Sequence, residues 1–263
     1  MKIGAYQFAV TKDMEKNLKT MHKAILQASQ EGVSLLVFPE CALTGYPPHD
    51  FESPADVDFD KLAALYDRLQ HMSTEYHMHL IVGTIQKEED KYYNTALLFS
   101  PDKKPQAYHK RALWGWDKDN FTEGSGKDAF EVMGLKIGVR ICYEIRFPEF
   151  FRELYKEQTD LNVILFYDVK TDQDVGRFEL MRSYIRVRAD ENVCNTLAIN
   201  TAGSFQTAPT MLCDKSGDIL AELPRHTEGM LVYDLQKEQL SFGEQGKQEL
   251  SNRLLRGEFP RIY

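Results

Sequence analysis

The sequence lacks the features of a membrane protein, of a secreted protein and of a nucleic-acid-binding protein. None of its apolar runs has the length of a membrane span, and the opening MKIGAYQFAV is too short and too polar for a signal peptide. Its 32 basic residues are outnumbered by 40 acidic ones, for a formal net charge of −8. Because nucleic acids and anionic membranes bind basic surfaces, we expect neither as a partner and expect a cytoplasmic protein.

The four cysteines include no CxxC pair and are widely spread along the chain. They are Cys41, Cys142, Cys194 and Cys213. In a reducing compartment this spacing argues against a disulfide framework and against a structural zinc site. The thiols are therefore expected to be free, and the question is which of them reacts.

The chain also lacks a Ser/Gly-rich linker, a low-complexity run and an internal repeat, so we expect one domain over residues 1–263. Apolar residues at helical spacing predict helices near residues 14–28, 59–72, 149–157 and 178–192. Short apolar runs between them predict buried strands, and the polar turn QKEEDK predicts an antiparallel hairpin. This alternation indicates an α/β fold with a mixed sheet or two packed sheets.

Three of the predicted strands end on a chemically reactive side chain. LLVFPE ends on Glu40, AYHK on Lys110 and GVRIC on Cys142. Taken singly, these residues are more often a surface carboxylate, a solvated lysine and a core thiol. Because ligands of α/β proteins bind beyond the carboxyl ends of strands, we expect the three to form one site.

Together the three side chains suit acyl transfer. A thiol reacts poorly until it loses its proton, and the helix predicted just after Cys142 would favour that loss through its positive end. Glu40 would take the thiol proton and later activate water. Lys110 would stabilise a tetrahedral oxyanion together with a backbone N–H. The pattern favours hydrolysis of a carbon–nitrogen bond through a thioester, with no metal required.

A Cys/His pair is the main chemical alternative. His109 precedes Lys110, but neighbours on a strand point to opposite faces, so His109 faces away if Lys110 faces the site. His49, in YPPHDF, is the one histidine in a plausible site loop. His77 and His79 flank a strand start without a carboxylate at ligand spacing. We therefore expect neither a metal nor another cofactor.

Three ordered segments carry a family resemblance. LLVFPECALTGYPP, YHKRALW and GVRICYEIRFPE resemble the signature segments of the nitrilase superfamily, the carbon–nitrogen hydrolases with a Glu-Lys-Cys triad. The resemblance implies that Glu40 is the general base, Lys110 the oxyanion stabiliser and Cys142 the nucleophile, with the Tyr143 N–H in the oxyanion hole. It also implies a four-layer α-β-β-α sandwich that assembles as a homodimer or a higher homo-oligomer.

The chain departs from the superfamily pattern at two places. Many members have a second glutamate in the loop after the lysine, and counting back from Phe121 puts Asp117 there. Glu123 is the alternative for this second carboxylate. The tryptophan usual in the later helix is replaced by Phe178, which leaves Glu179 as a further pocket candidate.

The segment CYEIRFPE resembles the amidase branches, including the omega-amidases that cleave dicarboxylic acid monoamides. The expected substrate is a small linear carboxamide, and an N-carbamoyl compound or a nitrile is the alternative. A substrate carboxylate would be bound by Arg146 or Arg177, unless these form structural salt bridges with nearby glutamates. Tyr46 and Trp114 complete the expected pocket, and the Trp114 loop is a candidate wall, lid or dimer contact.

Two other classes of function remain open. A non-catalytic scaffold would need a broken triad, yet all three residues are present. A thiol acyltransferase would deliver the acyl group to an amine instead of water. The tail NRLLRGEFPRIY, residues 252–263, is expected to be irregular and to dock on a partner subunit.

Overall fold

Two six-stranded mixed sheets face each other in the computed structural model, which describes residues 1–126 and 128–259. The first sheet has the order β12 (Gly229–Asp234), β1 (Lys2–Gln7), β2 (Leu35–Val37), β3 (His79–Glu88), β4 (Lys91–Ser100), β5 (Lys103–His109). The second has the order β11 (Ile219–Glu222), β10 (Met211–Cys213), β9 (Asn195–Ile199), β8 (Leu161–Leu165), β7 (Leu135–Ile141), β6 (Ala129–Val132). The two parallel triples are β1–β2–β3 and β7–β8–β9.

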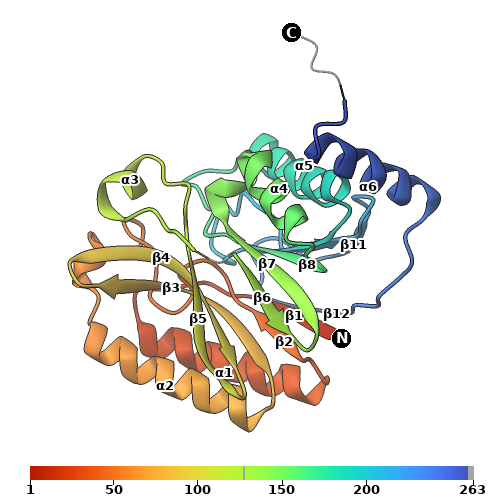
Figure 1. Cartoon of the computed structure of the whole chain (residues 1–263). Coiled ribbons are helices and arrows are strands. Elements are labelled where there is room, and N and C mark those ends of the chain that lie inside the picture. Colours follow the sequence, from red (N-terminus) through yellow and green to blue (C-terminus); the bar gives the residue numbers. More distant parts are fainter. Residues whose placement is uncertain (127, 260–263) are drawn as a thin grey trace.

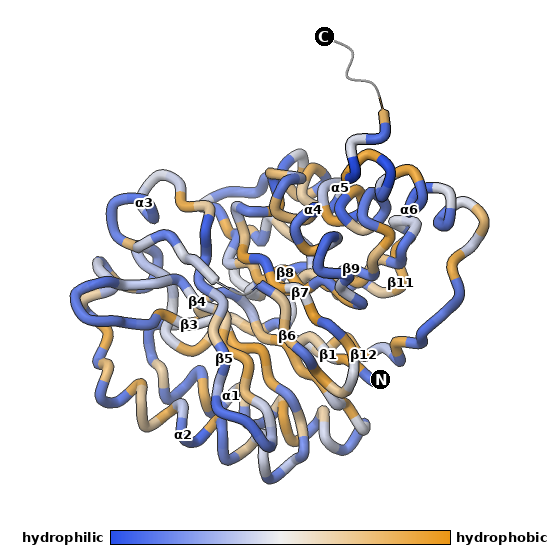
Figure 2. Tube along the Cα trace, in the orientation of Figure 1, coloured by the Kyte–Doolittle hydropathy of each residue, from blue (hydrophilic) through white to orange (hydrophobic). Residues whose placement is uncertain are grey.

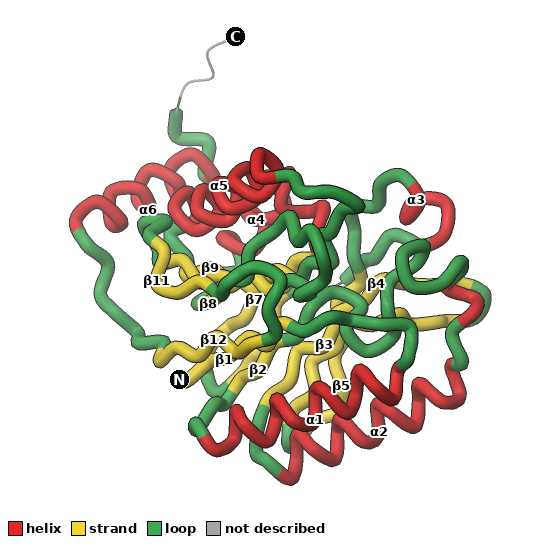
Figure 3. The backbone as a smooth tube through the Cα atoms, turned by 180° about the vertical axis from the view of Figure 1, so that it is seen from behind, coloured by secondary structure: helices red, strands yellow, loops and turns green. Residues whose placement is uncertain are grey.

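Helices cover the outer face of each sheet. On the first sheet lie α1 (Met14–Gln30) and α2 (Phe59–Glu75), and on the second lie α4 (Pro148–Lys156) and α5 (Val175–Asn192) (Figure 1). Seen from behind, α6 (Phe242–Leu255) lies on the same side as α4 and α5 (Figure 3). The expected four-layer α-β-β-α sandwich is confirmed. No helix in the described part of the chain is long and apolar enough to cross a membrane.

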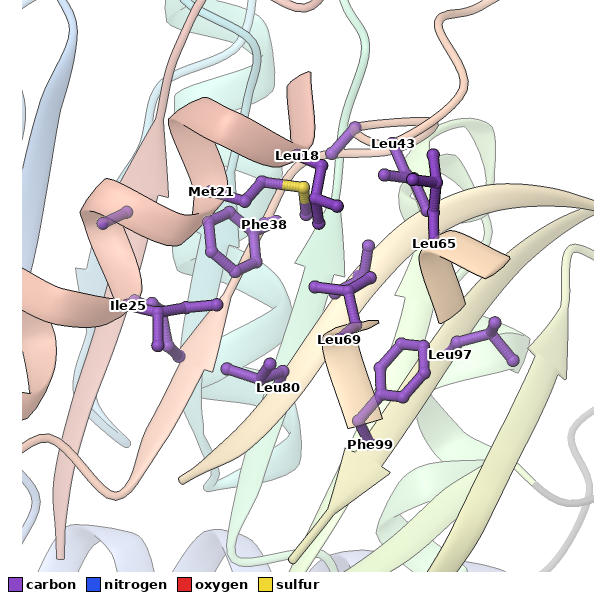
Figure 4. Close-up of a cluster of buried hydrophobic side chains, with 14 of the residues drawn as sticks. Leu18, Met21, Ile25, Phe38, Leu43, Leu65, Leu69, Leu80, Leu97 and Phe99 are labelled. Carbon is purple, nitrogen blue, oxygen red and sulfur yellow. The ribbon is translucent and has the colours of Figure 1, made fainter. Parts of the chain in front are cut away.

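Three apolar interfaces join the four layers. Side chains of α1 and α2 pack on β3 and β4 through residues that include Leu18, Ile25, Leu69, Leu80 and Phe99 (Figure 4). The interface between the sheets includes Ile3, Val37, Ile81, Val139, Val163 and Leu197. The third interface includes Phe151, Ile164, Ile185 and Ala198. Each fully buried aliphatic side chain contributes about 1.5–3 kcal/mol, and Figure 2 shows the hydrophobic colours concentrated along the central strands.

The predicted helices and the hairpin are confirmed, because their apolar spacing matches the faces they bury. The hairpin around QKEEDK is β3 paired with β4 in antiparallel register. The short α3 (Trp116–Asn120), in the loop that contains Trp114, was not predicted, and residue 127 of this loop lies outside the described residues. Neither was β6 or β11, which are only four residues long.

The prediction of an irregular tail from residue 252 was wrong, since residues 252–255 belong to α6. This helix starts with a capping box in which Ser241 and Glu244 exchange hydrogen bonds. Its apolar side chains, Phe242, Leu250, Leu254 and Leu255, are few and none of its residues is buried, so the helix lacks the long apolar face of α1 and α2. The last four residues of the tail, 260–263, lie outside the described residues.

A close backbone approach at Gly83 places the segment after β2. A Cβ atom at this position would lie 2.1 Å from the Pro39 carbonyl oxygen and 2.6 Å from the Glu40 Cα. Any side chain there would displace the loop, so only glycine lets Glu40 cross β3 at this distance. The Gly83 carbonyl also accepts a hydrogen bond from the Leu43 N–H at 3.1 Å.

Candidate active site

Glu40 lies just beyond β2 and only 1% of its side chain is exposed. Its Oε1 accepts hydrogen bonds from Lys110 Nζ at 2.9 Å and from Asn94 Nδ2 at 2.7 Å. Its Oε2 accepts from the N–H of Tyr167, which follows β8 of the opposite sheet, at 2.8 Å. Three donors on two oxygens hold this carboxylate in one orientation between the sheets.

Lys110 follows β5 and is the cation shared by two buried carboxylates. Its Nζ donates to Glu40 Oε1 at 2.9 Å and to Asp117 Oδ2 at 2.8 Å, while 2% of its side chain is exposed. Its backbone N–H donates to the Asn94 carbonyl oxygen at 2.8 Å. The Tyr46 hydroxyl donates to Asp117 Oδ1 at 2.5 Å. The ammonium group is therefore fixed from both sides.

Cys142 begins a 3-10 turn, Cys142–Arg146, at the end of β7, and its side chain is half-buried. Its φ of +46° lies in the left-handed region, which costs a residue other than glycine about 1–2 kcal/mol. The backbone therefore turns sharply at the one cysteine of the four that is not fully buried. Cys41 has the same backbone conformation, at φ +49°, but is buried, so partial exposure is what distinguishes Cys142 among the cysteines.

The electrostatics of the cluster keep a neutral thiol beside an anion and a cation. Burial raises the pKa of Glu40, and the Lys110 charge opposes this effect. Burial alone would lower the pKa of Lys110, but Glu40, Tyr46 and Asp117 outweigh it and raise that pKa well above its usual range. Burial raises the pKa of the Cys142 thiol strongly, the Glu40 charge adds to this, and the Lys110 charge opposes it.

The expectation that the following helix makes Cys142 more acidic was wrong. The 3-10 turn separates Cys142 from the first residue of α4, Pro148, and the pKa of the thiol is raised by burial. A thiol in this state needs a nearby acceptor for its proton before it can attack. After burial, the Glu40 charge has the largest influence on the pKa of this thiol, which makes Glu40 the candidate acceptor of its proton.

The two candidates for the second carboxylate are in different environments. Asp117 is 5% exposed, and its carboxylate accepts hydrogen bonds from both Lys110 and Tyr46. Glu123 lies exposed beyond α3. The structure therefore brings Asp117 and Tyr46 into the cluster and leaves Glu123 outside it.

Aromatic candidates line the segment around Cys142. The ring of Tyr143 stacks on that of Trp114, with centroids 6.3 Å apart and planes 14° from parallel. Trp114 is 69% exposed, so this stack forms the outer rim of the site. Phe178 is buried under the guanidinium group of Arg225, whose Cζ lies 4.3 Å from the ring centroid.

Glu179 is not brought to the cluster. Its side chain is 57% exposed and its carboxylate lies 3.7 Å from the guanidinium group of Arg182, one turn along α5. Since Phe178 faces inward from α5, the next residue, Glu179, points to solvent. No hydrogen bond or salt bridge joins Glu179 to Glu40, Lys110 or Cys142 in the described part of the chain.

The two arginine candidates also differ. Arg177 donates three hydrogen bonds of 2.8–3.1 Å to the carboxylate of Asp168, instead of pairing with a nearby glutamate. Arg146 lies with its Cζ 5.5 Å from the ring centroid of Tyr143 and has no salt bridge within the described residues. Of the two guanidinium groups, that of Arg146 is therefore the more available to a ligand.

Sequence reasoning missed three residues that contact the cluster or flank it. Asn94, in β4, bonds Glu40 with its side chain and Lys110 with its carbonyl. Tyr167 contributes only a backbone N–H, which no sequence pattern reveals. Glu144 is a buried carboxylate two residues after Cys142. Only Asn94 and Glu144 could have been recognised from the sequence, because each is a polar side chain next to apolar residues of a predicted strand.

A groove of about 750 Å³ lies elsewhere, between α6 and the ends of several strands. Its lining includes Met1, Leu235, Asn252 and Leu255. None of the residues that line it belongs to the cluster around Glu40, so it is not part of this site.

Comparison with known protein families identifies a match over almost the whole chain. The family model of the carbon–nitrogen hydrolases matches residues 2–242. Among solved structures, an amidase from Nesterenkonia sp. superimposes with a TM-score of 0.81 at 22% identity, covering 98% of this chain and 96% of that one. A carbon–nitrogen hydrolase superfamily protein from Xanthomonas campestris gives 0.78 at 19% identity, covering 100% and 99%. These two likenesses concern the fold.

Curated relatives match at low identity. A Schizosaccharomyces pombe hydrolase is 31% identical over 56% of this chain, and a Xenopus tropicalis omega-amidase is 29% identical over 60%. These matches span 49% and 59% of the relatives' own lengths. A 2-oxoglutaramate amidase from Bacillus subtilis is 28% identical over 75% of this chain and 76% of its own length.

Proposed function

Because the chain belongs to the carbon–nitrogen hydrolase family, we propose that it hydrolyses a small linear carboxamide and releases ammonia. The observation that carries this proposal is the buried Glu40–Lys110–Asp117 cluster at the strand ends beside the half-buried Cys142. A base, an oxyanion-stabilising cation and a thiol are the groups that acyl transfer to water needs.

In the first half-reaction Glu40 takes the proton of the Cys142 thiol, and Sγ attacks the amide carbon. The carbonyl electron pair moves to the oxygen, where the Lys110 ammonium group and the Tyr143 N–H stabilise the negative charge. Since the pKa of Lys110 is raised, this group keeps its proton and acts through its charge. When the intermediate collapses, the carbon–nitrogen bond breaks, the nitrogen takes the proton from Glu40, and ammonia leaves a thioester on Cys142.

In the second half-reaction water enters the site left by ammonia and attacks the thioester. Glu40, again a carboxylate, takes a proton from water while the oxygen attacks the thioester carbon. Lys110 and the Tyr143 N–H stabilise the second oxyanion. The carbon–sulfur bond then breaks, the sulfur takes the proton back from Glu40, and a carboxylic acid is released. The resting state of every residue is restored.

An Asn94→Ala substitution tests the role of Glu40 through the pH profile. Glu40 must be deprotonated to act, so activity is lost as the pH falls through its pKa. The Asn94 hydrogen bond lowers that pKa, and its removal raises the value further above the usual range. We expect the acid limb of the profile of kcat/KM to move to higher pH. An unmoved acid limb would show that Glu40 is not the group that titrates.

The substrate class we propose is a dicarboxylic acid monoamide. Similarity to an omega-amidase and a 2-oxoglutaramate amidase supports it. Such a substrate carries a carboxylate that must meet a cation when it is desolvated. Arg177 is engaged by Asp168, whereas Arg146 is four residues after the nucleophile with no salt bridge in the described part of the chain. We therefore propose that Arg146 binds the substrate carboxylate.

Replacing Arg146 by glutamine is expected to raise KM for an omega-monoamide about 10- to 100-fold, because a charged hydrogen bond contributes about 1.5–3 kcal/mol. Turnover of a neutral amide of the same length should change less than about threefold, since it offers no carboxylate. Steady-state kinetics with both substrates measure this. The control is Arg68→Gln, which removes an exposed arginine paired with Glu15. Equal losses on both substrates would contradict the role of Arg146.

Ammonia release from a substrate panel tests the function itself. The panel contains omega-monoamides, simple aliphatic amides, N-carbamoyl amino acids and nitriles. Release from the first class is expected. Release from N-carbamoyl compounds or nitriles alone would favour those alternatives, and transfer of the acyl group to an added amine would favour an acyltransferase. No release from any class would favour a scaffold.

We further propose that the protein acts in the cytoplasm as a homodimer or a higher homo-oligomer, without nucleic-acid or membrane partners. The net charge of −8 supports the absence of an anionic partner. The assembly is supported by the superfamily resemblance of the three sequence segments around Glu40, Lys110 and Cys142.

A further inference from the structure

Glu144 is a fully buried carboxylate that belongs to neither the nucleophile nor its base. Its Oε2 accepts a hydrogen bond from the Ile141 N–H at 2.6 Å. Its Oε1 accepts from the Tyr108 hydroxyl at 2.6 Å, from the Arg111 N–H at 2.7 Å and from the Ala112 N–H at 3.4 Å. One side chain thus satisfies three backbone donors.

The donors come from the two segments that carry the reacting groups. Tyr108 precedes Lys110 by two residues in the first sheet, and Arg111 follows Lys110 directly. Ile141 is the residue before Cys142, at the end of β7 in the second sheet. The Glu144 side chain therefore ties the backbone at Lys110 to the backbone at Cys142 across the two sheets.

The contacts of Glu144 are those of an acceptor, and not of an ion pair. No lysine or arginine side chain forms a salt bridge with it in the described residues, because Arg111 pairs with Glu153 and Arg140 with Asp128. An ionised carboxylate is the type of side chain in which both terminal oxygens accept hydrogen bonds, so it can accept from donors on both segments at once. A glutamine would present an amide N–H to one of the backbone donors.

We propose that Glu144 is a positioning residue that sets the distance between the Lys110 ammonium group and the Cys142 thiol. This inference rests on the proposed function, because the distance matters only if the two groups act on one substrate. The geometry predicts that loss of the Glu144 hydrogen bonds lets the backbone at Lys110 shift relative to the backbone at Cys142. A misplacement of about 1 Å can reduce a rate about 100-fold.

The test is Glu144→Gln, measured by two independent readouts. We expect kcat for an omega-monoamide to fall about 100-fold or more, with KM within about threefold. The second readout is the rate of alkylation of Cys142 by iodoacetamide as a function of pH, located by mass spectrometry and requiring no substrate. Because the Lys110 charge opposes the rise in the pKa of Cys142, displacement of Lys110 should move the alkylation midpoint to higher pH than in wild type.

Two controls separate positioning from stability. Glu153→Gln makes the same chemical change at a neighbouring carboxylate, which pairs with the side chains of Arg111 and Arg140 but accepts no backbone N–H from either segment within the described residues. Leu69→Ala destabilises the core far from the site. Both controls should keep the wild-type alkylation profile, although Leu69→Ala lowers the melting temperature.

An alkylation profile of Glu144→Gln equal to that of wild type would overturn the proposal and leave Glu144 a stabilising residue. If Glu144→Gln does not fold, Glu144→Asp takes its place: it keeps the charge but is one methylene too short to reach both segments, so it should show the same shifts. If wild type hydrolyses no amide, the proposed function fails, while the alkylation readout still decides the role of Glu144.

Discussion

Replacing Cys142 by alanine is expected to abolish amide hydrolysis and to leave the protein folded. The substitution removes the sulfur atom that forms the thioester in the proposed mechanism, so turnover should fall by about 10⁶-fold, to the background of the assay. The side chain is half-buried and small, and alanine adopts the same left-handed backbone at a similar cost. The free energy of unfolding should therefore change by no more than about 1 kcal/mol.

Ammonia release and thermal unfolding of the same preparations measure the two parts of this prediction. Cys213→Ala is the matched control, because it removes a buried thiol of β10 that belongs to the core beside α5 and not to the Glu40–Lys110–Asp117 cluster. The control should retain wild-type turnover. Substantial turnover by Cys142→Ala would show that the reaction does not pass through this thiol.

Replacing Glu40 by glutamine is expected to reduce kcat by about 10³-fold or more. Glutamine is nearly isosteric, but it cannot take the proton of a thiol whose pKa is raised by burial. The expected loss is larger than for an isolated base because the proposed mechanism uses Glu40 in both half-reactions. Lys110 keeps its hydrogen bond to Asp117, so the ammonium group stays paired and the fold should survive.

The control for this prediction is Glu123→Gln, which removes an exposed carboxylate from the loop after α3. It should leave kcat unchanged. Steady-state and single-turnover kinetics with a monoamide distinguish a slow acylation from a slow product release. If Glu40→Gln acylates Cys142 at the wild-type rate, another group must take the thiol proton.

The positions of Glu40, Lys110 and Cys142 at strand ends can be predicted from the sequence, because the end of a strand is visible in a few neighbouring residues. LLVFPE, AYHK and GVRIC each combine an apolar strand with a reactive terminal residue, and the structure has β2, β5 and β7 ending there. Glu40 and Lys110 lie in direct contact although 70 positions separate them. The layering of the sheets came from the family resemblance, because periodicity alone does not say which sheet a strand joins.

The supporting groups could not be predicted, since they depend on which backbone atoms meet across the sheets. The Tyr167 N–H that bonds Glu40 belongs to the opposite sheet and has no side-chain signature. The same holds for the donors that meet Glu144, at Ile141 and Arg111. The pKa of Cys142 was misjudged for a related reason, because burial is a property of the packed protein and not of the segment.

The central claim is that an acyl group from a carboxamide is carried on Cys142. The most direct measurement is the intact mass of the protein, followed by peptide mapping, after rapid acid quench of a reaction with an omega-monoamide. The account predicts a mass increase equal to the acyl group on the peptide that contains Cys142, formed as fast as ammonia is released and absent from Cys142→Ala. Ammonia release with no adduct at any time, or with an adduct on another residue, would contradict it.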